Sequence, residues 1–130
     1  PYVSDIYTVR KILYSSKNMK IVEEKDYVKK PKESGYRSLH LLALVPVQLS
    51  DGEKPVRVEI QIRTISMDSW ATVEHNLRYK AESENVTEDA IKKLQECSVK
   101  LAEVDNILES VAKQIQPDYY SYDWDDIAGD

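Results

Sequence analysis

The sequence has few of the features that mark disulfide-stabilised, membrane or zinc-finger proteins. Its single cysteine, Cys97, leaves no disulfide possible within the chain and favours a reducing, cytoplasmic compartment. No apolar run approaches the roughly 20 residues of a membrane-spanning helix, so no membrane partner is expected. The two histidines, His40 and His75, show no zinc-binding spacing, and Cys97 is expected in the core rather than as a nucleophile.

Phenylalanine is absent, whereas tyrosine occurs nine times, and its polar tip suits a ligand surface as well as a core. The net charge of -5 argues against nucleic acid as a partner. Positive charge nevertheless gathers in one short segment, at Lys25, Lys29, Lys30, Lys32 and Arg37. Walker-type and Gly-x-Gly-x-x-Gly loops are missing from the sequence, so phosphate would have to be held by side chains. The cluster either serves a small anionic ligand or is a solvated loop that blunts a strand edge.

Hydrophobic periodicity predicts an α+β domain over residues 1–116 and an acidic tail over 117–130, which we expect to be mobile. Helices are predicted over 4–14, 65–80 and 87–116, and strands over 20–27, 36–47 and 56–63. Ser4 and Asp5 are expected to cap the first helix, and Thr87 the last. An Asp-Gly turn within 50–53 predicts that the last two strands form an antiparallel hairpin.

The last predicted helix carries apolar residues at alternating spacings of three and four. They are Leu94, Cys97, Leu101, Val104, Leu108, Val111 and Ile115. This stripe is typical of a coiled-coil seam and would make the helix an oligomerisation element. A helix that packs on its own sheet would show the same stripe, so the pattern leaves both interpretations open.

The clearest alternation falls on the strand at 56–63, where one face is aliphatic and the other carries Glu59, Gln61 and Arg63. This polar face meets either solvent or a ligand cleft, and an ordinary amphipathic strand is the more common case. Tyr36 follows Gly35 and is able to stack on a base. Asp68 is able to accept from N1 and N2 of guanine, although an acidic residue near a helix start also balances the helix dipole.

Taken together, these segments resemble the RelA/SpoT-type synthetases. Residues 25–28, 31–32 and 34–40 are similar to the guanine-nucleotide loop of that family, 58–64 to its catalytic strand, and 67–71, 74–75 and 79–80 to the helix that follows. The order and spacing match from about residue 2 to residue 80. The short gaps between motifs are similar to those of the small alarmone synthetases. The resemblance implies that residues 1–116 form a partial synthetase domain, with 1–80 as its motif-bearing part.

The resemblance implies a nucleotidyltransferase-like mixed or antiparallel sheet flanked by helices, with a long C-terminal helix. It implies that Tyr36 stacks on guanine and that Asp68 reads the guanine edge. The remaining nucleotide-binding candidates are Lys25, Lys29, Lys32, Arg37, His40, Gln61 and Arg63. Glu59 would be the catalytic residue, which helps to hold Mg²⁺ and favours deprotonation of the ribose 3′-hydroxyl.

The implied activity moves a pyrophosphate group from ATP onto GDP or GTP, which yields AMP and (p)ppGpp, the alarmones of the stringent response. In this family, however, the ATP-binding residues and a second metal-binding Asp precede the first residue seen here. A single carboxylate, Glu59, is a poor Mg²⁺ site by itself. The alternative expectation is therefore a catalytically incomplete guanine-nucleotide-binding module or an oligomerisation fragment. A homo-oligomer is expected in either case.

Overall fold

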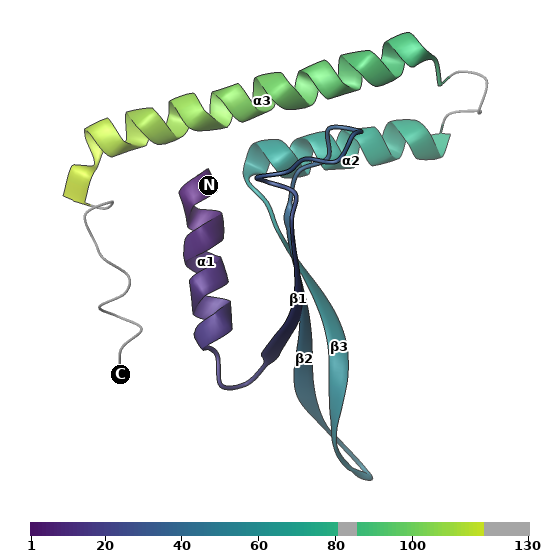
Figure 1. The fold of residues 1–130 in the computed structure, drawn as a ribbon, viewed down its shortest axis with the longest axis vertical. Helices are drawn as coiled ribbons and strands as arrows, with labels where there is room; N and C mark the ends of the chain where they lie inside the picture. The colour runs from purple at the N-terminus through teal and green to yellow at the C-terminus, as the bar shows by residue number, and fades with distance from the viewer. Residues whose placement is uncertain (81–85, 119–130) are drawn as a thin grey trace.

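The computed structural model describes residues 1–80 and 86–118, which form three helices and three strands (Figure 1). In chain order these are α1 (Val3–Ser15), β1 (Lys20–Asp26), β2 (Leu39–Leu49), β3 (Gly52–Ile62), α2 (Ile65–Lys80) and α3 (Glu88–Ile115). The predicted α+β class is confirmed. None of the helices in these two ranges is long and apolar enough to cross a membrane. Most of the predicted tail, 119–130, lies outside the described residues.

The sheet is antiparallel, in the order β1-β2-β3. A two-residue loop, Ser50 and Asp51, joins β2 to β3, and Leu49 pairs with Gly52. Gly52 has a φ of 115°, which only glycine adopts readily, so the predicted Asp-Gly turn is confirmed. The register of β1 against β2 shifts between Ile21 and Glu23, and this irregularity explains the imperfect alternation of β1 in the sequence.

The β2–β3 hairpin is longer than the sequence predicts at the two strand ends that meet at its turn. β2 begins three residues later than predicted but continues past Pro46 to Leu49, and β3 begins at Gly52. Pro46 lies directly opposite Pro55. Neither proline has an N–H to donate, so this pair falls where the ladder needs no bond between the two. The pairing with β1 stops at Leu44, and the hairpin therefore extends beyond the sheet as a two-stranded ribbon.

Helix α1 packs on one face of the sheet, and the core lies between them. Ile6 of α1 contacts Leu39 and Leu41 of β2, with Val28 and Met67 completing the buried cluster. Both leucines are fully buried. The helix begins one residue earlier than predicted, because the Asp5 carboxylate accepts from the backbone N–H of Tyr2 at 2.9 Å.

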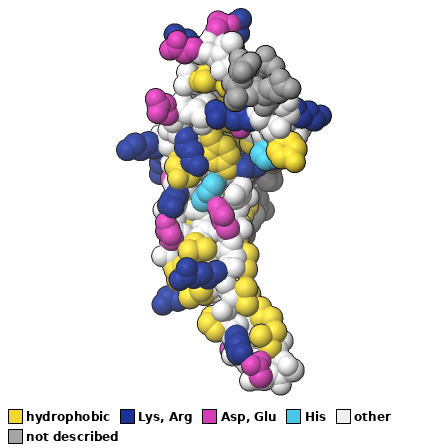
Figure 2. All heavy atoms as spheres, turned by 90° about the vertical axis from the view of Figure 1, so that its right-hand side faces the viewer, with side chains coloured by type: hydrophobic (Ala, Val, Ile, Leu, Met, Phe, Trp, Pro, Cys, Tyr) yellow, Lys and Arg dark blue, Asp and Glu magenta, His cyan; other side chains and the backbone are white. Residues whose placement is uncertain are grey.

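The outer part of the hairpin has no such cover. Val47, Leu49, Val56 and Val58 remain between 36% and 44% exposed. Figure 2 shows hydrophobic side chains along this protruding ribbon. The aliphatic face that the sequence predicts for β3 is thus half-buried only near Ile60 and Ile62, where it meets the core.

Helix α3 begins as predicted, with the Thr87 side chain accepting from the N–H of Ala90. It lies along α2 and passes the N-terminal end of α1 (Figure 1). Its buried positions are Ser98, Asp105 and Ala112, spaced by seven residues.

The predicted apolar stripe of α3 is largely on the surface. Cys97 is exposed, so its predicted place in the core is wrong. Val104, Leu108, Val111 and Ile115 are between 42% and 73% exposed. The side of α3 that carries Ser98, Asp105 and Ala112 faces the rest of the protein instead, because buried hydrogen bonds hold the helix in this orientation. The clearest is a 2.7 Å bond from the Thr64 hydroxyl to the Asp105 carboxylate.

Candidate functional site

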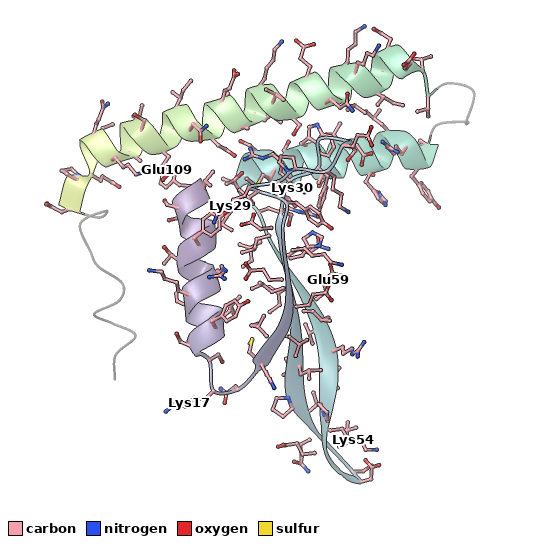
Figure 3. All side chains as sticks on the ribbon, in the orientation of Figure 1. Lys17, Lys29, Lys30, Lys54, Glu59 and Glu109 are labelled. Atoms are coloured by element: carbon pink, nitrogen blue, oxygen red, sulfur yellow. The ribbon has the colours of Figure 1, made fainter. Side chains whose placement is uncertain are left out.

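The face of the sheet that α1 leaves open carries most of the residues singled out from the sequence. His40 of β2 lies directly opposite Gln61 of β3 in the strand register, and Glu59 lies two residues earlier on β3. Glu59 points away from the side on which α1 packs (Figure 3). Figure 2 shows Lys, Arg and acidic side chains gathered around a histidine above the ribbon. Strand alternation places these side chains on one face, as the sequence predicts.

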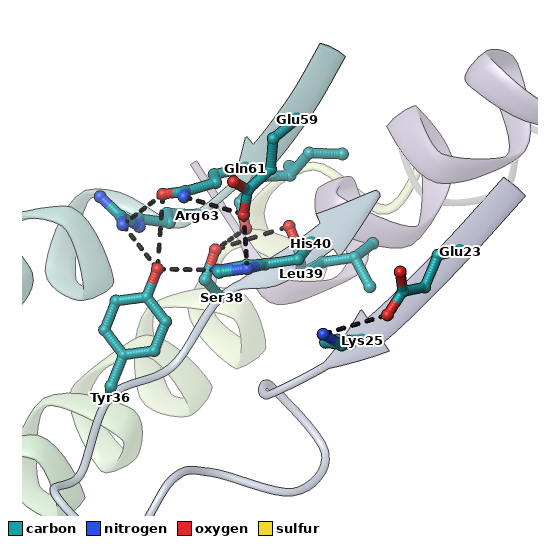
Figure 4. A network of polar contacts seen from close by, with 10 residues as sticks. Glu23, Lys25, Tyr36, Ser38, Leu39, His40, Glu59, Gln61 and Arg63 are labelled. Carbon is teal, nitrogen blue, oxygen red and sulfur yellow. Dashed lines mark hydrogen bonds and ion pairs between the residues drawn. The ribbon is translucent and has the colours of Figure 1, made fainter. Parts of the chain in front are cut away.

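A chain of hydrogen bonds joins these groups to Tyr36 (Figure 4). Arg63 donates from Nη2 to the Tyr36 hydroxyl at 2.6 Å, and the same hydroxyl lies 2.8 Å from Nε2 of His40. Nδ1 of His40 lies 3.0 Å from Oε1 of Glu59. One neutral tautomer satisfies every contact: Nδ1–H donates to the carboxylate, and Nε2 accepts from the tyrosine. Gln61 reinforces the chain, because it accepts from Arg63 at 2.7 Å and donates to Glu59 at 3.3 Å.

The neutral form of His40 is also the one that its surroundings favour. Burial lowers the pKa of His40 from its ordinary value of 6.5, and the nearby cations Lys32, Arg63 and Lys25 lower it further. The Glu59 carboxylate opposes this shift in part. His40 is therefore set to accept from Tyr36 rather than to carry a charge of its own at neutral pH.

Three rings and one ammonium group lie close together on this face. The rings of Tyr27, Tyr36 and His40 lie edge to face, with centroids 5.2 to 6.2 Å apart. Nζ of Lys32 lies 4.7 Å from the Tyr27 ring and 5.0 Å from the Tyr36 ring. Tyr27 is not among the predicted site residues, although it lies within residues 25–28, which resemble the family's guanine-nucleotide loop. Its backbone N–H donates to the carbonyl of Ser38 at 3.0 Å.

Asp68 lies in the first turn of α2, and its side chain is 64% exposed. Nη1 of Arg63 donates to it at 3.1 Å, while Nη2 of the same guanidinium holds Tyr36. The two residues predicted to contact guanine are thus brought to one side chain, although they are 32 positions apart in the sequence. An open carboxylate beside a ring is able to accept from a base that stacks on the ring.

A cavity of about 350 Å³ lies beside the network. It is lined by Glu23, Lys25, Tyr27, Lys32, His40, Leu41, Leu42 and Glu59. Lys25 is paired with Glu23 at 3.0 Å. Lys25 and Lys32 thus line the same cavity as Glu59. This arrangement suits the phosphates of a nucleotide.

The other two candidate cations lie elsewhere. Nζ of Lys29 lies 4.9 Å from the ring of Tyr7 on α1. Arg37 donates to the carbonyl of Val28 at 3.2 Å and interacts electrostatically with Tyr7 of α1. Burial raises the pKa of Tyr7 to about 12, aided by its hydrogen bond to Asp26 and opposed by Arg37. The basic cluster of the sequence is thus divided between the two faces of the sheet.

Glu59 is the one predicted metal ligand. Within 1–80 and 86–118, no group of three or more His, Cys, Asp or Glu side chains is placed to hold a metal ion. Mg²⁺ usually takes one or two carboxylates and completes its shell with water and substrate phosphates. Glu59 is 56% exposed beside the cavity, so it fits the part of a single carboxylate ligand that acts together with bound phosphates.

Comparison with known proteins identifies relatives of this chain. Residues 1–84 match the family described as a region found in RelA / SpoT proteins. The chain is 43% identical over 115 residues to GTP pyrophosphokinase YjbM of Bacillus subtilis (strain 168), which covers 88% of this chain and 54% of YjbM. It is 42% identical over 108 residues to GTP pyrophosphokinase YwaC of the same organism, which covers 83% of this chain and 49% of YwaC.

Solved structures give the same result. The crystal structure of small alarmone synthetase 1 from Bacillus subtilis bound to its product pppGpp matches with a TM-score of 0.83 and 41% identity. The match covers 88% of this chain and 58% of that chain. This chain spans about half the length of the curated relatives that it matches. The matched segment, 1–84, includes every residue of the network on the open face, and the chain belongs to the RelA/SpoT family.

Proposed function

We propose that this chain forms the guanine-nucleotide-binding part of an alarmone synthetase, which transfers a pyrophosphate group from ATP to the 3′-hydroxyl of GDP or GTP. The observation that carries the proposal is the network on the open face. One guanidinium, Arg63, holds both Tyr36 and Asp68, and the same network ends at Glu59 beside a cavity with two lysines. The names of the relatives, which are GTP pyrophosphokinases, support it.

In this proposal the guanine ring stacks on Tyr36, and its N1 and N2 donate to Asp68. Lys25 and Lys32 hold the acceptor's phosphates, and His40 and Gln61 lie beside the sugar. Lys29 and Arg37 are left out of the set, because Lys29 lies against Tyr7 of α1 and Arg37 is bonded to the carbonyl of Val28. Base stacking on an aromatic ring contributes about 1–3 kcal/mol, so Tyr36 is the residue on which affinity depends most.

Glu59 is proposed to hold Mg²⁺ together with substrate phosphates and to orient the attacking hydroxyl. When bound, the metal would offset the charge that develops on the transferred group. The Glu59 carboxylate already accepts from His40 and Gln61, both at Oε1, and Glu59 lines the cavity.

The test is calorimetric titration of the chain with GDP and with ADP, each in the presence of Mg²⁺. GDP is expected to bind and ADP to bind much more weakly, because adenine offers no N1–H and N2–H₂ pair to Asp68. Tyr36→Ala is expected to abolish measurable GDP binding, whereas Tyr79→Ala, at a ring that is 85% exposed on α2, leaves it unchanged. Equal binding of the two nucleotides would refute the proposal.

A second candidate function is binding without catalysis. It is favoured by the small number of possible metal ligands. Among the described residues that line the cavity, Glu59 is one carboxylate, and the other, Glu23, is paired with Lys25. This candidate predicts guanine-selective binding and no release of AMP from a mixture of ATP and GDP. Release of AMP above the rate of a Glu59→Gln variant would exclude it.

We also propose that the chain self-associates through α3. The exposed stripe of Val104, Leu108, Val111 and Ile115 has the spacing of a helix–helix seam, and a second copy would bury it. Sedimentation velocity is expected to show a dimer or larger species, which Leu108→Glu dissociates and Ser110→Glu, at a neighbouring exposed position, does not. A monomer at every concentration would contradict this part of the proposal.

A further inference from the structure

The loop between β1 and β2 carries Lys32 and Tyr36 in a turn at residues 32–36. Two backbone bonds close this turn, from the N–H of Lys32 to the carbonyl of Tyr36 at 3.1 Å and from the N–H of Gly35 to the carbonyl of Lys32 at 2.9 Å. The carbonyl groups of Glu33 and Gly35, within the turn, face α3. Lys25, His40 and Gln61 lie on strands, which are more rigid than such a loop.

Two side chains of α3 form hydrogen bonds with these carbonyl groups. Gln95 donates from Nε2 to the carbonyl of Glu33 at 2.7 Å, and the Ser98 hydroxyl donates to the carbonyl of Gly35. Ser98 is buried, at 6% exposure, whereas Gly35 is half-buried and Glu33 is exposed. The bond to Gly35 is therefore the better shielded of the two, and loss of its donor should cost more than loss of the exposed bond to Glu33.

Gly35 is what allows the loop to come this close to α3. Its φ is 96°, and a Cβ at this position would lie 3.0 Å from Cβ of Ser98. Only a residue without a side chain satisfies both conditions. The glycine that precedes the stacking tyrosine is thus matched to a serine on a helix that lies 63 positions later.

Helix α3 is itself fixed to the element that carries Asp68. The indole N–H of Trp70 on α2 donates to the carbonyl of Leu94 at 2.9 Å. Thr64, which also accepts from the N–H of Met67 at the start of α2, donates to Asp105. The loop and the first turn of α2 are therefore held by one helix, and this sets the distance between the ring of Tyr36 and the carboxylate of Asp68.

We infer that Gln95 and Ser98 are positioning residues for the guanine-nucleotide site, through which α3 holds the Lys32–Tyr36 turn against the rest of the face. Both residues lie outside the segment that matches the family, 1–84. The inference rests on the proposed function for its nucleotide part, whereas the tie between α3 and the loop stands without it. The two parts are separated by two readouts on the same variants.

The first readout is amide hydrogen exchange by NMR in Gln95→Met and Ser98→Ala. Both variants remove a donor and nearly keep the shape of the side chain. Exchange at Lys32 and Gly35 is expected to accelerate severalfold, while exchange at Leu41 in β2 stays unchanged. Gln114→Met and Ser110→Ala, near the far end of α3, are the matched controls and should alter neither. A general loss of stability would accelerate Leu41 as well.

The second readout is the Kd for GDP of the same four variants and the wild-type chain. Gln95→Met and Ser98→Ala are each expected to weaken GDP binding roughly two- to twelvefold, the equilibrium value of one hydrogen bond. The controls should match the wild type. Gly35→Ala, which pushes the loop off Ser98, is expected to weaken binding at least as much.

Unchanged exchange at Lys32 and Gly35 in both variants would overturn the tie, whatever the nucleotide does. Faster exchange with an unchanged Kd would overturn the positioning role. A wild-type chain that binds no GDP would overturn the proposed function and with it the nucleotide role of α3, while the exchange rates would still decide whether α3 holds the loop.

Discussion

The two faces of the sheet differ in what holds their side chains in place. On the α1 side, Leu39, Leu41 and Ile6 are sealed from water, and shape and burial fix them. On the open side, Tyr36, His40 and Glu59 are fixed by a directed chain of hydrogen bonds that ends in an exposed carboxylate. The covered face stabilises the fold and the open face carries the candidate site, although the side chains of the two faces alternate along β2 and β3.

The same division explains why four cations of one short segment have two different surroundings. Lys25 and Lys32 line the cavity on the open side, whereas Lys29 and Arg37 contact α1 or the backbone on the covered side. Proximity in the sequence is therefore a poor guide to shared function here, because neighbouring residues of an extended chain face opposite ways.

The largest expected effect is on the covered face. Leu41→Ala should lower the free energy of unfolding by about 2–5 kcal/mol, since Leu41 is fully buried and its loss leaves a cavity. Val58→Ala on the ribbon, where the side chain is 39% exposed, should cost only about 0.5 kcal/mol. Urea unfolding of both variants measures the contrast, and similar losses at the two positions would show that the ribbon is covered after all.

The next effect compares two lysines of the same segment. Lys32→Gln should weaken GDP binding about tenfold, as expected when one charge-assisted contact to phosphate is lost. Lys29→Gln should change the Kd less than about twofold, because Lys29 lies against Tyr7 on the other side. Titration calorimetry at one salt concentration gives both values. Equal losses would mean that net charge rather than position governs binding.

The smallest effect is the pH dependence that His40 contributes. Its pKa in the folded chain is lowered below 6.5, so the unfolded chain takes up this proton first. The free energy of unfolding should therefore fall as the pH drops from 6.5 toward the lowered pKa, by at most about 1.4 kcal/mol per pH unit. His40→Asn should remove this slope, and His75→Asn, on exposed α2, should retain it. A slope that survives in His40→Asn would place the titrating group elsewhere.

Much of this arrangement follows from sequence patterns. The alternation of β3 placed Glu59, Gln61 and Arg63 on one face, and the Asp-Gly turn gave the hairpin. Thr87 marked the start of α3 within one residue. These features depend on contacts or backbone preferences close in the chain, which a sequence pattern records directly.

Other features depend on contacts between distant segments, and the sequence does not record these. The apolar stripe of α3 left open which side of the helix is buried within one chain, because that side is set by long-range hydrogen bonds such as the one between Thr64 and Asp105. The sequence did not predict that the cations lie in two different surroundings, because the loop residues show no hydrophobic periodicity. Ser98 carried no signal of its own, since it acts through Gly35, 63 positions earlier in the chain.

The claim that the open face binds guanine nucleotide is tested most directly by NMR titration of the ¹⁵N-labelled chain with GDP and Mg²⁺. The account predicts that the largest shifts of amide signals fall on Tyr36, His40, Gln61 and Asp68, with little change along α1. It also predicts that ADP leaves the Asp68 signal in place. Shifts centred on α1 and Lys29, or identical shifts with both nucleotides, would contradict it.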